Sequence, residues 1–335
     1  MRYIQNPPNP YHKYSAEYIG EPPETRLEVF EEVATKSMIT KSNMPDMGVR
    51  YTVNCYRGCI HACTYCFARR YHEFLGYGAG TDFETKIVAK VNAPQVLRED
   101  LKRTKEKIRH LEFSFTTDPY LPLEANYELT RKCLMVCRDF RMPVAVITKS
   151  PLITRDLDVL TDLQATVFFS IPFPTIEKSK PFEPFVPVPD ARFRAMETLA
   201  KAGIEVGIGI APIIPAYNDA DIPVLLERAR NAGATRAFMN LVHFDSDTVE
   251  DYFVRKLREK LPTKADKILN ALRRERGGQL RHRTYAERSG KTEQWQMAVR
   301  LFELHFKRLG FTKFRQIEKP EEEKPAPPVQ RNLFH

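Results

Sequence analysis

Four of the six cysteines in this 335-residue chain fall between Cys55 and Cys66. The last three, Cys59, Cys63 and Cys66, have the spacing CxxxCxxC in the stretch CIHACTYC. Three thiolates are one short of a tetrahedral zinc site, whereas an iron–sulfur cubane on three thiolates leaves one iron open to an outside ligand. Cys55, just upstream, is the candidate for a fourth thiolate, which would give a closed electron-transfer cluster or a zinc knuckle instead. The spacing therefore indicates metal chemistry and leaves these arrangements open.

The elements that must position the cysteines alternate between two patterns from residue 48 onward. Short, β-branched apolar runs predict strands buried on both faces, at residues 48–54, 111–117, 143–150, 164–171, 205–214 and 236–244. Segments with apolar residues at i, i+3 and i+4 predict helices between them, at residues 92–110, 123–140, 154–163, 189–203 and 218–233. This alternation favours parallel strands with right-handed crossovers, in a doubly wound sheet or a partial barrel.

Polar side chains follow most of the predicted strands at the point where each strand ends. They are Asn54, Thr116, Thr117, Asp118, Lys149, Ser150, Ser170 and His243. Because the carboxyl ends of parallel strands meet at one edge, we expect these groups to surround a ligand cavity there. Strand ends also need ordinary helix caps, so some of these residues are expected to be caps only.

Four segments are predicted from the changes in composition along the chain. Residues 1–47 are proline-rich and are expected to form a wrapping arm with a helical stretch near EVFEEVATKSM. Residues 48–245 form the alternating core, and residues 246–317 a mostly helical, basic extension that contains Trp295. Residues 318–335 are charged and proline-rich, so we expect them to be disordered.

The charge of the chain is +9 and is unevenly distributed. Residues 253–283 carry eleven Lys or Arg against three Asp or Glu, which suits either nucleic-acid contact or a solvated basic face. No run of eighteen apolar residues occurs and the N-terminal stretch lacks an apolar secretory core, so we expect a cytoplasmic protein with no membrane partner. Clustered thiols in a reducing compartment are more often metal ligands than disulfides.

The chain resembles the radical S-adenosylmethionine (SAM) superfamily, and more closely its spore photoproduct lyase-like branch, often labelled DNA repair photolyase. The resemblance extends over about residues 38–250 and is carried by NCYRGCIHACTYCFARRY, SFTTDPYLPLEANYELTRKCL, VITKSPLITRDLD, SIPF and GIAPIIP. It implies an α/β fold, a partial (β/α)6 TIM-type barrel. It also implies a [4Fe-4S] cluster on Cys59, Cys63 and Cys66, with SAM bound to the open iron.

The resemblance further implies which residues contact SAM and what reaction follows. The implied contacts are Tyr65 and Ala211 near the adenine, Thr117 and Asp118 near the methionine end, and Lys149 and Ser170 near the carboxylate or ribose. A reductant such as flavodoxin or ferredoxin would supply the electron that cleaves SAM to a 5'-deoxyadenosyl radical, which abstracts hydrogen from a substrate. The substrate stays open, with nucleic acid one candidate. The alternative is a non-catalytic iron–sulfur or zinc protein that binds nucleic acid.

One position separates the chain from true spore photoproduct lyases, and the cysteines outside the CxxxCxxC motif are interpreted separately. The stretch FSFTTD has Phe115 where those lyases carry the cysteine that returns a hydrogen atom, so we do not expect repair of the spore thymine dimer. The role of Cys55 stays open. Cys133 and Cys137, spaced i, i+4 on a predicted helix, are expected to be buried structural residues.

Overall fold

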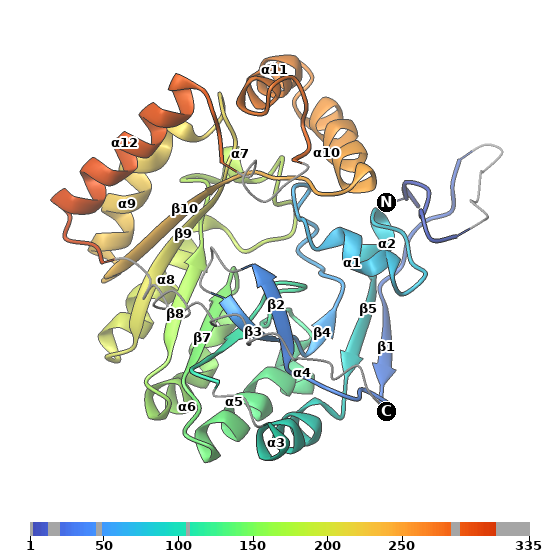
Figure 1. Cartoon of the computed structure of the whole chain (residues 1–335), viewed down its shortest axis with the longest axis vertical. Helices are drawn as coiled ribbons and strands as arrows, with labels where there is room; N and C mark the ends of the chain where they lie inside the picture. Colours follow the sequence, from blue (N-terminus) through green and yellow to red (C-terminus); the bar gives the residue numbers. More distant parts are fainter. Residues whose placement is uncertain (1–2, 13–20, 45–48, 105–107, 283–288, 313–335) are drawn as a thin grey trace, which may run out of the picture.

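The computed structural model describes residues 3–12, 21–44, 49–104, 108–282 and 289–312 (Figure 1). The predicted tail, residues 318–335, lies outside the described residues. Among the described helices, none has the length and apolar character needed to cross a membrane.

A seven-stranded sheet forms the centre of the molecule, in the order β10-β9-β8-β7-β6-β3-β2. Six of its strands run parallel, and their order across the sheet is their order along the chain. They are β3 (Val49–Val53), β6 (Leu111–Phe113), β7 (Val144–Thr148), β8 (Thr166–Ser170), β9 (Glu205–Ile213) and β10 (Arg236–Leu241). β2 (Thr40–Met44) pairs antiparallel with β3 and forms one edge. The six-unit partial barrel predicted from the sequence is confirmed, with every predicted strand present.

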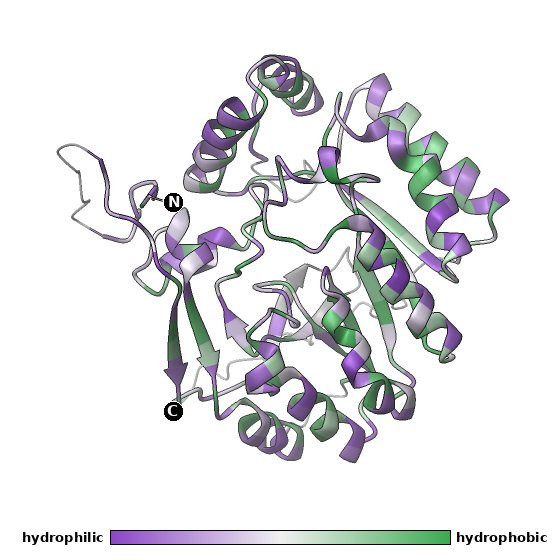
Figure 2. Cartoon of the chain, turned by 180° about the vertical axis from the view of Figure 1, so that it is seen from behind, coloured by the Kyte–Doolittle hydropathy of each residue, from purple (hydrophilic) through white to green (hydrophobic). Residues whose placement is uncertain are grey.

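Helices cover the outer face of this sheet (Figure 1). They are α3 (Ala93–Arg103), α4 (Glu124–Tyr127), α5 (Leu129–Asp139), α6 (Leu157–Asp162), α8 (Pro189–Lys201) and α9 (Ile222–Asn231). Their apolar faces pack inward and their polar faces point outward, while the strands between them are apolar (Figure 2). The single helix predicted over residues 123–140 is wrong in one respect, because Glu128 has a φ of 53° and divides it into α4 and α5.

A second, three-stranded sheet lies beside the barrel, in the order β1-β5-β4. It contains β1 (Glu28–Glu32), β5 (Lys86–Lys90) and β4 (Tyr56–Arg57). β1 pairs in parallel with β5 along its whole length. The helical stretch expected near EVFEEVATKSM is therefore wrong: tertiary pairing with β5 overrides the helix propensity of its Glu and Ala residues. Two short helices, α1 (Arg69–Glu73) and α2 (Thr81–Thr85), precede β5.

The expected C-terminal helices are α10 (Asp247–Lys260), α11 (Ala265–Glu275) and α12 (Glu293–Arg308). α12 packs on α9, and its Trp295 joins the main hydrophobic core. α10 and α11 contribute to a second core that also contains Cys63, Tyr65 and Phe182. The extension thus packs directly against the cysteine loop.

Two glycines of β9 leave room for aromatic rings on its neighbours. A Cβ at Gly207 would lie 2.5 Å from the ring of Phe168, and a Cβ at Gly209 would lie 2.7 Å from the ring of Phe238. The two phenyl rings, 5.4 Å apart, pack over the bare backbone of β9. The glycines are therefore required by close packing rather than by backbone conformation.

Candidate functional site

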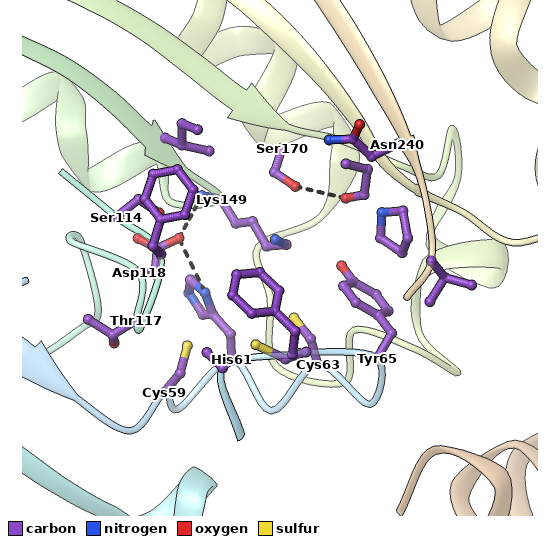
Figure 3. A pocket seen from close by; sticks show the side chains of 18 of the residues that line it. Cys59, His61, Cys63, Tyr65, Ser114, Thr117, Asp118, Lys149, Ser170 and Asn240 are labelled. Carbon is purple, nitrogen blue, oxygen red and sulfur yellow. Dashed lines mark hydrogen bonds and ion pairs between the residues drawn. The ribbon is translucent and has the colours of Figure 1, made fainter. Parts of the chain in front are cut away.

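A cavity of about 190 Å³ lies at the carboxyl ends of the parallel strands (Figure 3). All nine residues that the sequence singled out for the cluster and for SAM line it: Cys59, Tyr65, Cys63, Cys66, Thr117, Asp118, Lys149, Ser170 and Ala211. They come from the cysteine loop after β3 and from the ends of β6, β7, β8 and β9. The structure brings together positions that are up to 152 residues apart in sequence, from Cys59 to Ala211.

The cysteine loop, residues 54–68, is fixed by backbone contacts to neighbouring segments. The amide of Cys59 donates to the carbonyl of Phe83 at 2.8 Å, and the amide of Thr64 donates to the carbonyl of Phe182 at 2.9 Å. Gly58 has a φ of +76°, and a Cβ there would lie 2.9 Å from the Lys86 carbonyl. Glycine is therefore needed at this turn, immediately before the first cysteine.

The three thiols of the motif differ little in their surroundings. Cys59 and Cys63 are buried and Cys66 is half-buried. Burial raises the pKa of Cys59 to about 12 and also raises the pKa of Cys63 and Cys66. The free thiols are therefore protonated at neutral pH, and binding of iron must displace their protons.

In the described part of the chain, no three His, Cys, Asp or Glu side chains converge on the position of a single metal ion. A mononuclear zinc site requires such convergence. The thiols in a cubane each bind a different iron and stand further apart. Three thiols of the motif line one cavity, so the donor set that such a cluster requires is present.

Cys55 lies outside the lining of the cavity. Its thiol donates to the thiol of Cys133, with 3.6 Å between the two sulfur atoms, and both residues are buried in the main core. Cys137, on the same face of α5, is buried beside them. The structure thus places Cys55 with the structural cysteines and apart from the CxxxCxxC thiols.

The carboxylate of Asp118 connects the ends of β6 and β7. Its Oδ1 accepts from the Thr148 hydroxyl at 2.6 Å and its Oδ2 accepts from the Lys149 amide at 2.7 Å. His61, between the first two cysteines of the motif, brings its Nδ1 to 3.5 Å from the same Oδ2 (Figure 3). Thr117 donates through its hydroxyl to the carbonyl of Gly58 at 2.6 Å. Asp118 and Thr117 therefore fix strand ends to the cysteine loop in addition to lining the cavity.

Lys149 and Tyr65 face each other across the cavity, with the Lys149 Nζ 5.9 Å from the centre of the Tyr65 ring. Burial lowers the pKa of Lys149, but neighbouring negative charge, including that of Glu183, outweighs it, so the pKa of Lys149 is raised and the group is cationic. The hydroxyl of Tyr65 donates to Glu183. Arg192 donates to Glu183 at 2.5 Å and to the carbonyl of Ser170 at 2.8 Å.

The pair Glu183–Arg192 was missed by the sequence analysis. Both side chains are fully buried, and together they connect Tyr65 of the cysteine loop to the end of β8. Arg192 lies in a predicted helix and Glu183 in a proline-rich loop, so neither position carries a local signal of its role.

Ser170 and Ala211 meet at the ends of β8 and β9. The Ser170 hydroxyl donates to the Ala211 carbonyl at 3.3 Å. The side chain of Asn218 accepts from the Ile214 amide at 2.6 Å and donates to the Pro212 carbonyl at 3.0 Å, which holds the backbone after Ala211 in place.

Some of the other strand-end residues form local hydrogen bonds, and others line the cavity. Asn54 accepts from the Thr116 amide and so ties the end of β3 to the loop after β6, whereas Ser150 accepts from the Leu152 amide and caps the short 3-10 helix Pro151–Asp156. His243 lines the cavity as expected. The sequence analysis did not anticipate Asn240, which lines the cavity near Ser170 (Figure 3).

Comparison with known proteins agrees with this geometry. Residues 53–229 match the family model described as the radical SAM superfamily. The chain belongs to this superfamily. Membership in the radical SAM superfamily implies an enzyme, and its members typically use an iron–sulfur cluster and SAM; the comparisons identify neither the reaction nor the substrate.

Two similar proteins carry the description "uncharacterized protein". One from Mycobacterium tuberculosis is 34% identical over 226 residues, which cover 65% of this chain and 66% of that protein. One from Methanocaldococcus jannaschii is 30% identical over 223 residues, which cover 66% of this chain and 78% of that protein. The match thus spans just under two thirds of the mycobacterial relative.

Solved structures of spore photoproduct lyase share the fold. A lyase complexed with dinucleoside spore photoproduct has a TM-score of 0.59 and 15% identity, covering 85% of this chain and 81% of that one. A mutant lyase with bound AdoMet and dinucleoside spore photoproduct has a TM-score of 0.53 and 17% identity, covering 70% of this chain and 66% of that one. At these identities the likeness establishes the fold alone.

Proposed function

We propose that the chain is a radical SAM enzyme that holds a [4Fe-4S] cluster on Cys59, Cys63 and Cys66 and binds SAM in the same cavity. The observation that carries this proposal is the shared cavity: three thiols of the motif, Tyr65 of the same loop and five residues from the ends of four strands surround one space. When bound, the cluster and SAM together supply reductive cleavage to a 5'-deoxyadenosyl radical, which abstracts hydrogen from a substrate. The substrate class is not fixed by the family.

The residues of the cavity match the chemical groups of SAM. The half-buried, cationic Lys149 suits a carboxylate, and a charge-assisted bond of this kind is stronger in a partly desolvated site than at the surface. Asp118 has the acceptor character that an amino group requires. Ala211 presents a small side chain beside a fixed backbone, which permits close approach of a flat ring, and Tyr65 offers an aromatic face.

Apolar side chains form part of the cavity wall. Phe67, Phe115, Phe238 and Val242 line it together with the polar groups. A dry, shaped site protects a reactive radical from side reactions, which is the contribution expected of the protein in such chemistry. Phe115 presents a phenyl ring rather than a thiol, so we propose that no hydrogen atom is returned to product from this position.

The test of the proposed function is product formation after anaerobic reconstitution with iron and sulfide. With dithionite and SAM, we expect the reconstituted protein to produce 5'-deoxyadenosine, measured by liquid chromatography. Lys149→Met should keep the cluster absorbance but weaken SAM binding by about 2 kcal/mol or more, because a half-buried charge partner is lost. An intact cubane that yields no 5'-deoxyadenosine would contradict the proposal.

We also propose two partners for this enzyme. A one-electron carrier of the flavodoxin or ferredoxin class would reduce the cluster. Nucleic acid would contact the basic helices α10 and α11. The exposed Lys264, Lys267 and Arg274 support this contact, since within the described residues they take part in no ion pair.

A further inference from the structure

The guanidinium of Arg69 is enclosed directly behind the cysteine loop. The side chain is fully buried, three residues after Cys66. Its Nε donates to the Cys63 carbonyl at 3.0 Å, and its Nη1 donates to the carbonyls of Ala79 at 3.0 Å and Gly80 at 2.9 Å. Arg69 therefore brings a full positive charge into hydrogen-bond contact with the backbone of a cluster-binding cysteine.

The counter-charge lies on the far side of the guanidinium. Nη2 of Arg69 donates to Oε1 of Glu84, in α2, at 2.6 Å. The hydroxyl of Tyr252, in α10, donates to the same oxygen at 2.6 Å, and its ring lies 4.1 Å from the guanidinium carbon. The pair is thus oriented, with its positive end towards Cys63 and its negative end towards α10.

The surroundings of the pair are dry and partly aromatic. Phe83 lies 5.1 Å from the guanidinium carbon on another side, and Glu84 is 5% exposed. In such an environment a charge acts over a longer range than it does in water. The Arg69 Nε donates to the carbonyl of Cys63, so the charge acts within hydrogen-bond distance of the cysteine loop.

The neighbouring Arg70 provides a contrast within the same helix. Its side chain is 31% exposed and pairs with Asp245 at 2.7 Å, where solvent screens the charge. Adjacent arginines of one helix therefore stand in different dielectric surroundings, one buried behind the cysteines and one at the surface. The chain thus contains its own matched control.

We propose that Arg69 and Glu84 are positioning residues that set the reduction potential of the cluster held by this loop, with Arg69 raising it and Glu84 lowering it. Reduction adds one negative charge to a cluster, and net charge and hydrogen bonds near its sulfurs are principal determinants of its potential. The inference rests on the proposed function, since it requires the cluster on Cys59, Cys63 and Cys66.

The experiment is a potentiometric titration of the reconstituted protein without SAM, followed by electron paramagnetic resonance of the reduced cluster. Arg69→Gln should shift the midpoint to a more negative potential, and Glu84→Gln should shift it to a more positive one. Arg70→Gln should stay close to wild type. Opposite signs from two partners of one pair identify an electrostatic effect, because a loosened loop would move both variants in the same way.

The possible outcomes separate the inference from the proposed function. If wild type binds the cluster but Arg69→Gln and Glu84→Gln shift together, or by no more than Arg70→Gln, the inference is overturned and the proposed function stands. If wild type binds no cluster, both are overturned. If circular dichroism shows that Arg69→Gln does not fold, the test uses Arg69→Lys and Glu84→Gln instead. A more positive midpoint potential in Glu84→Gln, with little change in Arg69→Lys, supports the inference. Any other result overturns it.

Discussion

Cys55 and Cys59 are four residues apart, yet their thiols lie in different surroundings. The Cys55 thiol contacts Cys133 of α5 within the main core, while the Cys59 thiol lines the cavity. The partner of Cys55 is 78 residues away in sequence, so no local pattern distinguishes a fourth ligand from a packed thiol. The CxxxCxxC spacing itself predicted the residues that share the cavity.

Substitution of single cysteines tests this division. Cys63→Ala should lose the brown absorbance of the reconstituted cluster, because only two thiolates of the motif remain. Cys55→Ala should keep it and lose roughly 1–2 kcal/mol of stability from the cavity left in the core. Absorbance spectra and denaturant unfolding measure both effects. Equal loss of absorbance in the two variants would instead indicate ligation by four thiolates.

The hydrogen-bond network around Glu183 is a part of the site that local sequence patterns did not predict. Asp118 and Lys149 were predicted because they follow continuous apolar strands. Glu183 and Arg192 neutralise each other in the core and connect the cysteine loop to β8, but this pairing exists only after α8 has packed against the barrel. Long-range pairing of this kind has no signature in the local sequence.

At the scale of elements, the six parallel strands were predicted because each is buried on both faces and therefore reads as a continuous apolar run. The strand β1 was not predicted, since its residues Glu28–Glu32 are exposed or half-buried at the edge of a small sheet and include helix-favouring glutamates. Pairing with β5, more than fifty residues later, decides its conformation. The break between α4 and α5 was likewise invisible, because Glu128 is not a residue that ordinarily marks a left-handed position.

The packing of α1 against α2 has a consequence for stability against pH. His72 of α1 is 1% exposed and packs against the rings of Tyr77 and Phe83, and burial lowers its pKa from 6.5 to about 4. Between these values the unfolded chain binds a proton that the folded chain does not. The free energy of unfolding should therefore decrease by about 2 kcal/mol as the pH falls from 7 to 5.

Denaturant unfolding of wild type and His72→Gln at the two pH values measures this contribution. The variant should be less stable at pH 7 but should lose less stability on acidification, because glutamine does not titrate. An equal loss in both proteins would show that His72 does not carry the pH dependence.

At the scale of the whole molecule, the C-terminal extension and the barrel meet at the cysteine loop. The second hydrophobic core contains Cys63 and Tyr65 together with Phe253 of α10 and Leu269 of α11. The basic surface of α11 thus belongs to a helix pair that packs against the candidate active site. A nucleic acid bound there would be anchored close to the cysteine loop.

Salt dependence tests this surface. Binding of a duplex oligonucleotide, followed by fluorescence anisotropy between 50 and 200 mM KCl, should weaken steeply with salt in wild type. The plot of the logarithm of the binding constant against the logarithm of the salt concentration should become less steep in the triple variant Lys264→Gln, Lys267→Gln, Arg274→Gln. The slope should decrease in magnitude by up to about 3, because each lost phosphate contact removes roughly 0.9.

The control removes the same number of charges elsewhere. Lys102, Lys132 and Lys201 lie on α3, α5 and α8, on the outer face of the barrel and away from α11 (Figure 1). Changing these three lysines to glutamine should leave the salt dependence of binding at its wild-type slope. Equal flattening in both triple variants, or no salt dependence in wild type, would contradict contact through α11.

The two glycines of β9 have a consequence for how this scaffold diversifies. Phe238 lies over Gly209 and also lines the cavity, so the absence of a Cβ on one strand determines how far a ring on the next strand extends into the cavity. An alanine at position 209 would displace that ring without altering any group assigned to the cluster or to SAM. Changes at this one position can thus widen or narrow the cavity, and with it the range of molecules that fit, while the CxxxCxxC loop stays unchanged.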